Sequence, residues 1–345
     1  MEAQQFNEIR IKKPSYPVTD ALRGYLDAHG RAAPLPIGYA ELLRHDGLMP
    51  QVDAAGRPTL WTTVLLRPQD QAELHEQLVD LYQMVAADGR RIDYLKVASI
   101  DFCAYGNSQP FRIKILNQIN DNHDYYYIKK ADASRVYGLE LEHLLSPNKI
   151  NYMVHRDTLV EEHIIGVPGD TFMQEPERYG AHLSPVRLSK EFVKFNERCF
   201  ARLLGDMRAY NFVVDVIQDF DQVQYRLRSI DFDQQSYDGR HRIYLPQFYK
   251  ENLPFVEFAQ QYISYETAAQ YSNEERALLR KRYMLAQSQI EALIAVMKDD
   301  VVSTEEHVTM LARELSIFHR DVEMGRCRSM GAVLERHLAL RLELR

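Results

Sequence analysis

The sequence contains few cysteines, and they lie far apart. Its three cysteines are Cys103, Cys199 and Cys327. No two of them have the close spacing of a zinc-binding pair, and their number does not suggest a disulfide framework. The sequence therefore predicts neither kind of site, and a reducing cytoplasm is the compartment that fits it best.

The chain also lacks an excess of positive charge and any long apolar run. Its formal net charge is -7. Because surfaces that bind nucleic acid are normally basic, we expect no nucleic-acid partner. An acidic balance is compatible with a cationic substrate but is too common to indicate one. No apolar run approaches membrane-spanning length, and residues 1–5 show no start of a secretory signal, so we expect a soluble protein with no membrane partner.

Apolar residues, by contrast, are plentiful. They make up 46% of the 345 residues, enough to fill the cores of two lobes or domains. The pattern predicts a mainly helical N-terminal extension over 1–92, a β-rich small lobe over 93–168, and a mainly helical large lobe over 169–345. We find no internal repeat and no low-complexity segment.

Three helices are predicted by their amphipathic periodicity. The first spans 70–87 and places four apolar residues on one face: Leu74, Leu78, Leu81 and Val85. The other two span 274–298 and 304–318. Ser303 with Glu306 forms the capping signature that predicts the start of the last helix.

The motif with the clearest chemical content lies at 206–211, where Asp206 is followed five residues later by Asn211. After an apolar run and a polar turn, the segment 229–233 contains Asp231 and Asp233. Carboxylate and amide oxygens are ligands that Mg²⁺ prefers, and a carboxylate also accepts the proton of an attacking hydroxyl. These residue types in this order favour phosphoryl transfer.

The elements expected around this motif support that interpretation. The preceding helix has one apolar stripe, formed by Phe192, Phe195, Cys199 and Leu203. Two strands are expected at 211–217 and 224–230, joined by a turn around Asp219 and Asp221. The alternative is that these acids are ordinary surface turn residues, because an Asp five positions before an Asn occurs roughly once by chance in a chain of this length.

The motif resembles that of the protein kinase-like superfamily, whose catalytic loop has the same Asp–Asn spacing and whose metal-binding Asp opens an Asp-Phe-Gly triplet. This chain has Asp-Phe-Asp at 231–233, and Leu204–Gly205 where the family usually has His-Arg or His-Gly. The resemblance covers roughly residues 93–300 and implies a two-lobed α+β fold. It also implies that Asp206 is the catalytic base and that Asn211 and Asp231 are metal ligands. Asp233 would add a second carboxylate near the metal.

A second group of candidate residues lies upstream. A β-prone run ends in Lys129 and Lys130, and the segment 134–145 that follows is typical of a short helix carrying Glu140. The resemblance implies that Lys129 contacts the α- and β-phosphates of ATP and that Glu140 steadies it. Glu142 is the alternative to Glu140. Because strand side chains alternate, Lys130 is expected on the opposite face, and a solvated surface lysine is the alternative for Lys129.

A turn at Gly106, Asn107 and Ser108 joins two expected strands just before the lysine strand. Backbone amides and the Ser108 hydroxyl can donate to nucleotide phosphates. The family's loop usually has several glycines, whereas this one has only Gly106. A plain hairpin turn is therefore the alternative.

The triplet at 155–157, His-Arg-Asp, spells the catalytic triplet of protein kinases, but Glu162 stands where the metal-binding Asn would fall. We therefore expect a turn between two strands there. The strand 158–165 ends at Gly166 and resembles the hinge of aminoglycoside and choline phosphotransferases. This resemblance implies that the segment from Glu161 to Ile164 binds adenine, chiefly through backbone groups. An ordinary strand with a Gly-Pro turn is the alternative.

Together these features predict an ATP- and Mg²⁺-dependent phosphotransferase. The absence of an Ala-Pro-Glu motif after Asp233 favours a hydroxyl-bearing small molecule over a protein as the acceptor. Two alternatives stay open. The departures from the family pattern allow an inert nucleotide-binding scaffold, and a nucleotide bound in reverse would allow transfer of AMP.

Overall fold

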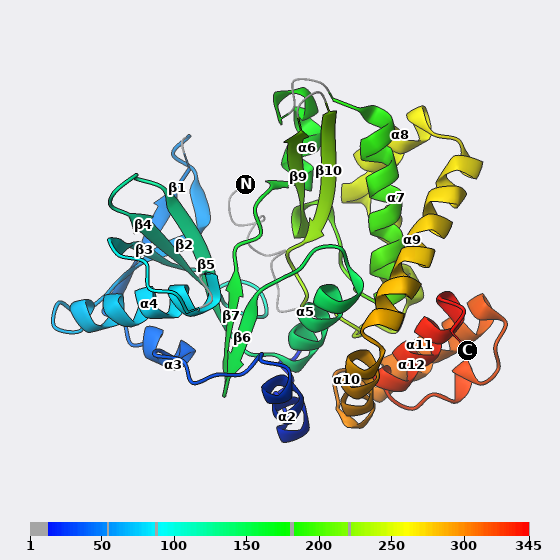
Figure 1. Cartoon of the computed structure of the whole chain (residues 1–345), viewed down its shortest axis with the longest axis horizontal. Coiled ribbons are helices and arrows are strands. Elements are labelled where there is room, and N and C mark those ends of the chain that lie inside the picture. The colour runs from blue at the N-terminus through cyan, green and yellow to red at the C-terminus, as the bar shows by residue number, and fades with distance from the viewer. Residues whose placement is uncertain (1–12, 54, 87–88, 180–182, 220–221, 345) are drawn as a thin grey trace. The chain divides into compact units, whose positions relative to one another are not determined.

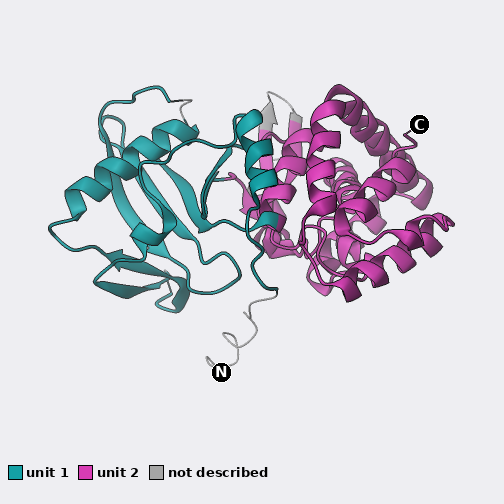
Figure 2. Ribbon diagram, turned by 90° about the horizontal axis from the view of Figure 1, so that it is seen from below, with its two compact units in different colours: residues 1–133, 150–163 teal, residues 134–149, 164–345 magenta. Residues whose placement is uncertain are grey.

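The computed structural model of the chain describes residues 13–53, 55–86, 89–179, 183–219 and 222–344. The fold is mixed α+β, as the sequence predicted. Two units divide the chain (Figure 2). Unit 1 contains residues 1–133 and 150–163, and unit 2 contains residues 134–149 and 164–345. The chain therefore passes between the units three times, and neither unit is one continuous segment.

Unit 1 is built on a seven-stranded sheet in which neighbouring strands run antiparallel. In spatial order its strands are β1 (Gly47–Val52), β2 (Pro58–Leu65), β3 (Leu95–Phe102), β4 (Phe111–Asn117), β5 (His123–Lys130), β7 (Thr158–Glu162) and β6 (Tyr152–His155). The hairpin of β3 and β4 and the hairpin of β6 and β7 confirm the strand pairs expected on either side of 106–108 and of 155–157.

Helix α4 (Gln71–Ala86) packs against this sheet, with Leu78, Leu81 and Val85 buried in the core (Figure 1). It matches the predicted helix at 70–87. Two shorter helices, α2 (Asp20–Ala28) and α3 (Tyr39–Leu42), complete the unit. The structure differs from the predicted helical extension in containing β1 and β2. Their apolar side chains are largely exposed or half-buried, so the sequence lacks the strong alternation of a half-buried strand.

Unit 2 contains a three-stranded antiparallel sheet with the strand order β10-β9-β8. Strand β9 (Phe212–Asp219) pairs with β10 (Gln222–Ser229) along its full length, and both pair as predicted. The short β8 (Val167–Pro168) adds to the other edge of β9. Of the predicted turn, Asp219 is the last residue of β9, and Asp221 lies outside the described residues.

Helix α7 (Pro185–Arg202) packs against α8, α9 and β10 in unit 2 (Figure 1). The predicted stripe of Phe192, Phe195, Cys199 and Leu203 is buried. The other helices are α5 (Ala133–Leu145), α6 (Gly169–Gln174), α8 (Leu253–Tyr262), α9 (Tyr265–Leu285), α10 (Gln287–Asp299), α11 (Glu305–His319) and α12 (Met330–Arg341). Short 3-10 turns include η2 (Ala209–Asn211), η3 (His241–Tyr244) and η4 (Pro246–Phe248). Within the described ranges, no helix is both long and apolar enough to cross a membrane.

Two details of the predicted C-terminal helices need correction. The expected helix at 274–298 is two helices, because α9 ends at Leu285 and α10 begins at Gln287. The N-cap of α11 is Thr304 rather than Ser303. The Thr304 hydroxyl accepts a hydrogen bond from His307 N, whereas Ser303 Oγ is buried and donates to the Tyr237 carbonyl at 2.5 Å.

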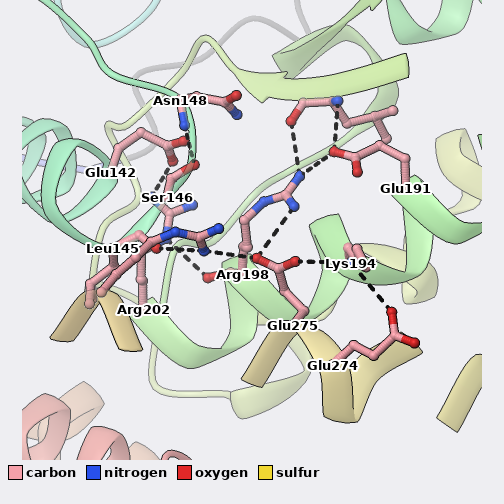
Figure 3. Close-up of polar contacts among 12 residues, drawn as sticks. Glu142, Leu145, Ser146, Asn148, Glu191, Lys194, Arg198, Arg202, Glu274 and Glu275 are labelled. Atoms are coloured by element: carbon pink, nitrogen blue, oxygen red, sulfur yellow. Dashed lines mark hydrogen bonds and ion pairs between the residues drawn. The ribbon is translucent and has the colours of Figure 1, made fainter. Parts of the chain in front are cut away.

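Buried ion pairs tie α5 and α9 to α7 (Figure 3). Arg198 of α7 donates to Glu191 at 2.6 Å and lies 3.7 Å from Glu275 of α9. One turn further along α7, Arg202 pairs with Glu142 of α5. Removing one partner of such a buried pair leaves an uncompensated charge, which is destabilising. The pairs therefore favour the observed positions of α5 and α9 along α7. They hold α5, whose N-terminal turn reaches the candidate site.

Candidate functional site

The β9–β10 hairpin places Asn211 and Asp231 at the same end of the small sheet. Asn211 immediately precedes β9, and Asp231 follows β10 by two residues. The backbone N–H of Ile230 donates to the Asn211 carbonyl at 3.0 Å, which extends the strand pairing by one step. Two residues that are twenty positions apart in the sequence are thereby held at neighbouring backbone positions.

The loop that carries Asp206 is fixed beside the segment that follows Asp231. Gly205 N donates to the Gln234 carbonyl at 3.2 Å, and Ser236 N donates to the Leu203 carbonyl at 2.9 Å. A side chain at Gly205 would meet the same Gln234 carbonyl with its Cβ at 3.1 Å, so glycine permits the close approach. The loop 203–206 and the segment 231–236 therefore form one local structure.

Three residues of this structure have left-handed backbone conformations without being glycine. They are Leu203 with φ 53°, Asp206 with φ 58° and Ser236 with φ 48°. Side chains make this region costly, especially for a bulky residue such as leucine. Strained backbone of this kind persists where the surrounding contacts determine it, and it clusters at functional sites.

The Asp206 side chain is buried and oriented by a cation. Its Oδ1 accepts a hydrogen bond from Arg208 Nε at 2.8 Å, and Arg208 also pairs with Glu251 at 2.7 Å. The backbone N–H of Asp206 donates to Tyr249 Oη at 3.0 Å, and that hydroxyl donates to the Ile243 carbonyl at 2.8 Å. Burial, reinforced by the Asp206 carboxylate, raises the pKa of Tyr249, so the phenol stays protonated and keeps this role.

The amide of Asn211 has its nitrogen occupied and its oxygen available. Asn211 Nδ2 donates to the Asp206 carbonyl at 2.7 Å, which fixes the orientation of the amide group. In the described part of the chain no donor reaches Asn211 Oδ1. This oxygen can therefore serve as a ligand.

Asp231 and Asp233 share a buried cation that the sequence did not indicate. Arg135, in the first turn of α5, donates from Nη1 to Asp231 Oδ1 at 3.0 Å and to Asp233 Oδ1 at 2.9 Å. The N–H of Asp233 also donates to Asp231 Oδ1, at 3.0 Å. Of the two oxygens of Asp231, Oδ2 has no hydrogen-bond donor among the described residues. No local motif marks Arg135, because its partners are nearly a hundred residues away.

Helix α5 approaches this segment closely at Gly138. A Cβ there would lie 3.0 Å from Phe232 Cβ and 3.1 Å from Gln235 Cβ. The hydroxyl of Ser134 donates to the Gln235 carbonyl at 2.6 Å. The first two turns of α5 therefore position the Asp231–Asp233 segment by packing, hydrogen bonding and charge together.

The oxygens at this site suit magnesium better than a metal that needs a complete protein cage. Within the described ranges, no group of three or more His, Cys, Asp or Glu side chains is arranged to hold a metal ion. Magnesium is commonly bound through one or two carboxylates, with water and substrate phosphates filling its other positions. Asn211 Oδ1 and Asp231 Oδ2 fit that smaller requirement.

In unit 1, the predicted phosphate-binding lysine has a carboxylate partner. Lys129 is buried on β5 and donates from Nζ to Glu161 of β7 at 2.7 Å. Lys130 is exposed, in agreement with the expectation that the two lysines face different sides of the strand. Glu161 belongs to the predicted hinge, and no sequence motif indicated that its side chain would pair with Lys129.

Glu140, the predicted partner of Lys129, belongs to unit 2. Its Oε1 accepts a hydrogen bond from Gln289 of α10 at 2.9 Å. Glu142, the alternative, pairs with Arg202. Because Lys129 and Glu140 lie in different units, their pairing stays a prediction.

The predicted phosphate loop is tied to the lysine strand. Gly106 has a left-handed conformation, with φ 87°, in the connection between β3 and β4. Ser108 is buried, and its carbonyl accepts a hydrogen bond from Lys130 N at 3.4 Å. The loop and the end of β5 therefore lie together within unit 1.

The predicted hinge contains one of the passages between the units. Strand β7 ends at Glu162, whose N–H donates to the Asn151 carbonyl at 3.0 Å. The chain leaves unit 1 after His163, and the buried Ile164 is the first residue on the other side. The triplet at 155–157 lies at the turn between β6 and β7, as expected, with Arg156 at φ 55°.

No model of a known protein family matches the chain, and no curated protein has a sequence that matches it. The case for a function therefore depends on the residues described above.

Proposed function

We propose that the chain is an ATP- and Mg²⁺-dependent phosphotransferase with a kinase-like fold that acts on a hydroxyl group of a small molecule. The observation that carries this proposal is the joint structure of the loop 203–211 and the segment 231–236. It brings Asp206, Asn211 and Asp231 together, and it leaves Asn211 Oδ1 and Asp231 Oδ2 without a donor from the described chain.

The arrangement of the elements supports the kinase-like fold. An antiparallel sheet carries Lys129, and a mostly helical unit carries the Asp–Asn loop and the strand pair that ends near Asp231. The hinge expected from the sequence coincides with a passage from one unit to the other. This order matches the resemblance that the motifs suggested.

Each residue would have a distinct task. Bound Mg-ATP supplies a γ-phosphoryl group whose negative charge the metal offsets. Asn211 and Asp231 would hold the metal, and Lys129, steadied by Glu161, would bind the α- and β-phosphates. Asp206 would accept the acceptor's hydroxyl proton as the acceptor oxygen bonds to phosphorus and the bond to ADP breaks. Arg208 would orient the Asp206 carboxylate for that transfer.

The remaining predicted residues would position the nucleotide. Backbone amides around Gly106 and the hydroxyl of Ser108 would donate to phosphate oxygens. Backbone groups from Glu162 to Ile164 would hydrogen-bond adenine, and Glu140 would act from α5 as an orienting carboxylate. None of these roles requires a proton to be transferred.

Mg-ATP binding tests the site. Saturating ATP with Mg²⁺ should raise the thermal midpoint of the full chain, because a ligand that binds only the folded state stabilises it. Asp231→Asn should remove the Mg²⁺-dependent part of this shift. Asp215→Asn, on the same hairpin and outside the site, is the matched control and should behave as the wild type. A wild-type chain without any shift would refute the proposal.

A nucleotide-binding scaffold without activity is the second candidate, and Arg135 favours it. Its guanidinium already offsets part of the negative charge of Asp231 and Asp233, which lowers their attraction for a cation. Asp206→Ala separates the two functions. An enzyme should keep Mg-ATP binding and lose about 10²–10⁴-fold in transfer of γ-phosphate to a metabolite extract. A scaffold should bind Mg-ATP and transfer nothing.

A further inference from the structure

A hollow of about 130 Å³ opens in unit 2 beside the Asp206 loop. Its lining residues are Arg240, Arg242, Ile243, Phe248 and Tyr249. Tyr249 accepts the hydrogen bond from Asp206 N, and its hydroxyl donates to the Ile243 carbonyl, so the hollow shares two residues with the support of the proposed base. A group bound there would lie next to the Asp206 loop.

The lining carries positive charge and no carboxylate. Arg240 is partly neutralised, because Nε and Nη2 each lie 3.2 Å from a carboxylate oxygen of Asp238. Arg242 is exposed and has no ion pair within the described part of the chain. It is therefore the cation of this hollow that is available to an incoming anion.

The Arg242 side chain also lies over an aromatic ring. Its guanidinium carbon lies 4.5 Å from the centre of the Phe248 ring. An arginine stacked on an aromatic face keeps its N–H groups free at the edge, where they can bind a carboxylate or phosphate in a two-point manner. Phe248 is itself half exposed, and its ring makes this cation–π contact with Arg242.

We propose that this hollow binds an anionic group, a phosphate or a carboxylate, of the acceptor, with Arg242 as the main contact. The inference rests on the proposed phosphotransferase function and narrows its substrate to small alcohols that carry negative charge. The hollow is smaller than the ~300–1,000 Å³ of pockets that enclose a whole small-molecule ligand, so it would hold one end of the acceptor. The hydroxyl at the other end would then face Asp206.

Calorimetric titration of the full chain with inorganic phosphate, and separately with malonate, tests the hollow without requiring turnover and distinguishes the two kinds of anion. We expect the wild type to bind at least one of them. Arg242→Gln should weaken that binding about tenfold or more, because it removes charge-assisted hydrogen bonds to the anion. Arg242→Lys should be intermediate, since it keeps the charge and loses the two-point geometry.

Arg313→Gln is the matched control, because Arg313 is an exposed arginine of α11 outside the hollow. It should bind the anion as the wild type does. The thermal shift with Mg-ATP should be the same in all of these variants. Failure of the wild type to bind either anion, or unchanged binding by Arg242→Gln, would overturn the inference. Anion binding in a chain that shows no Mg-ATP shift would instead overturn the acceptor role and the proposed function behind it.

Discussion

Arg135 is the residue whose role depends most on contacts between distant parts of the sequence. Its side chain is 2% exposed, and one of its nitrogens serves both Asp231 and Asp233. Asp233 is buried, so it needs this cation, whereas Asp231 is partly exposed and keeps one oxygen without a donor from the described residues. The two acids therefore differ in environment, and under the proposed function Asp233 would be structural whereas Asp231 would bind the metal.

Replacing Arg135 by Met should lower the free energy of unfolding by about 3–5 kcal/mol, because it removes the cation that pairs with the buried Asp233 carboxylate. Urea unfolding followed by far-UV circular dichroism measures this change. Arg313→Met, at an exposed position, should change stability by no more than about 0.5 kcal/mol. Equal effects of the two substitutions would contradict the role assigned to Arg135.

Lys129 and Lys130 offer an internal comparison on one strand. Lys129→Ala should weaken ATP binding by about tenfold or more, because a charge-assisted contact to phosphate is lost. Lys130→Ala should have little effect, since that side chain faces solvent. Isothermal titration with Mg-ATP measures both. If both substitutions had the same negligible effect, β5 would not be the phosphate-binding strand.

At the scale of secondary-structure elements, periodic sequences were the most predictable. Helices α4, α5 and α11 and the β9–β10 hairpin were predicted to within a few residues from local sequence patterns. A helix was also expected where α7 lies, from its apolar stripe, but without stated bounds. Strands β1 and β2 were missed because their apolar side chains are mostly not buried. The break between α9 and α10 was also missed, since no proline or glycine marks Ala286.

The candidate site likewise contains residues that were predictable from the sequence and residues that were not. The positions of Asp206, Asn211 and Asp231 were predictable because a loop, a strand and a hairpin connect them in the sequence. Arg135, Arg208 and Tyr249 were not assigned roles, and Glu161 was assigned only to the hinge. The contacts that define these residues cross large sequence separations or involve residue types with no motif. The proposed chemical roles come from the resemblance, whereas the residues that support them were found only from tertiary contacts in the structure.

The N-terminus of α11 provides a test of a single element. Thr304→Ala should lower the free energy of unfolding by about 1 kcal/mol, because the His307 N–H loses its cap. Thr304→Asp should restore most of the loss, since a carboxylate caps the same N–H and interacts favourably with the helix dipole. Thermal or urea unfolding measures the difference. An Asp variant as unstable as the Ala variant would argue against Thr304 as the N-cap.

At the scale of the molecule, a pair of histidines in unit 2 should make the stability of the chain depend on pH. His319 Nε2 lies 2.9 Å from His337 Nδ1, and His337 Nε2 bonds the Phe200 carbonyl at 3.0 Å. Burial, then His319 and Arg341, lower the pKa of His337 to about 3. Burial and Arg341 lower the pKa of His319 to about 4. Both rings are therefore neutral in the folded chain well below pH 6.

The unfolded chain binds more protons at these histidines below about pH 6.5, their ordinary pKa, so stability should fall as pH decreases from 6.5 toward 4. Each histidine should contribute about 1.4 kcal/mol per pH unit across that window. Urea unfolding of the full chain, followed by far-UV circular dichroism at several pH values between 7 and 4.5, measures how the free energy of unfolding changes with pH. His319→Gln should make the slope shallower, and an unchanged slope would contradict this origin.

The triple passage of the chain between the units has a consequence for biosynthesis. Unit 1 cannot complete its sheet until β6 and β7 have been translated, and α5, which belongs to unit 2, is translated before them. The buried Glu142 of α5 cannot form its ion pair with Arg202 until the end of α7 has been translated. Nascent chains usually fold one continuous domain after another, from the N-terminus onward. Here that order is unavailable, and dividing the gene at any of the three passages between the units leaves at least one unit without one of its segments.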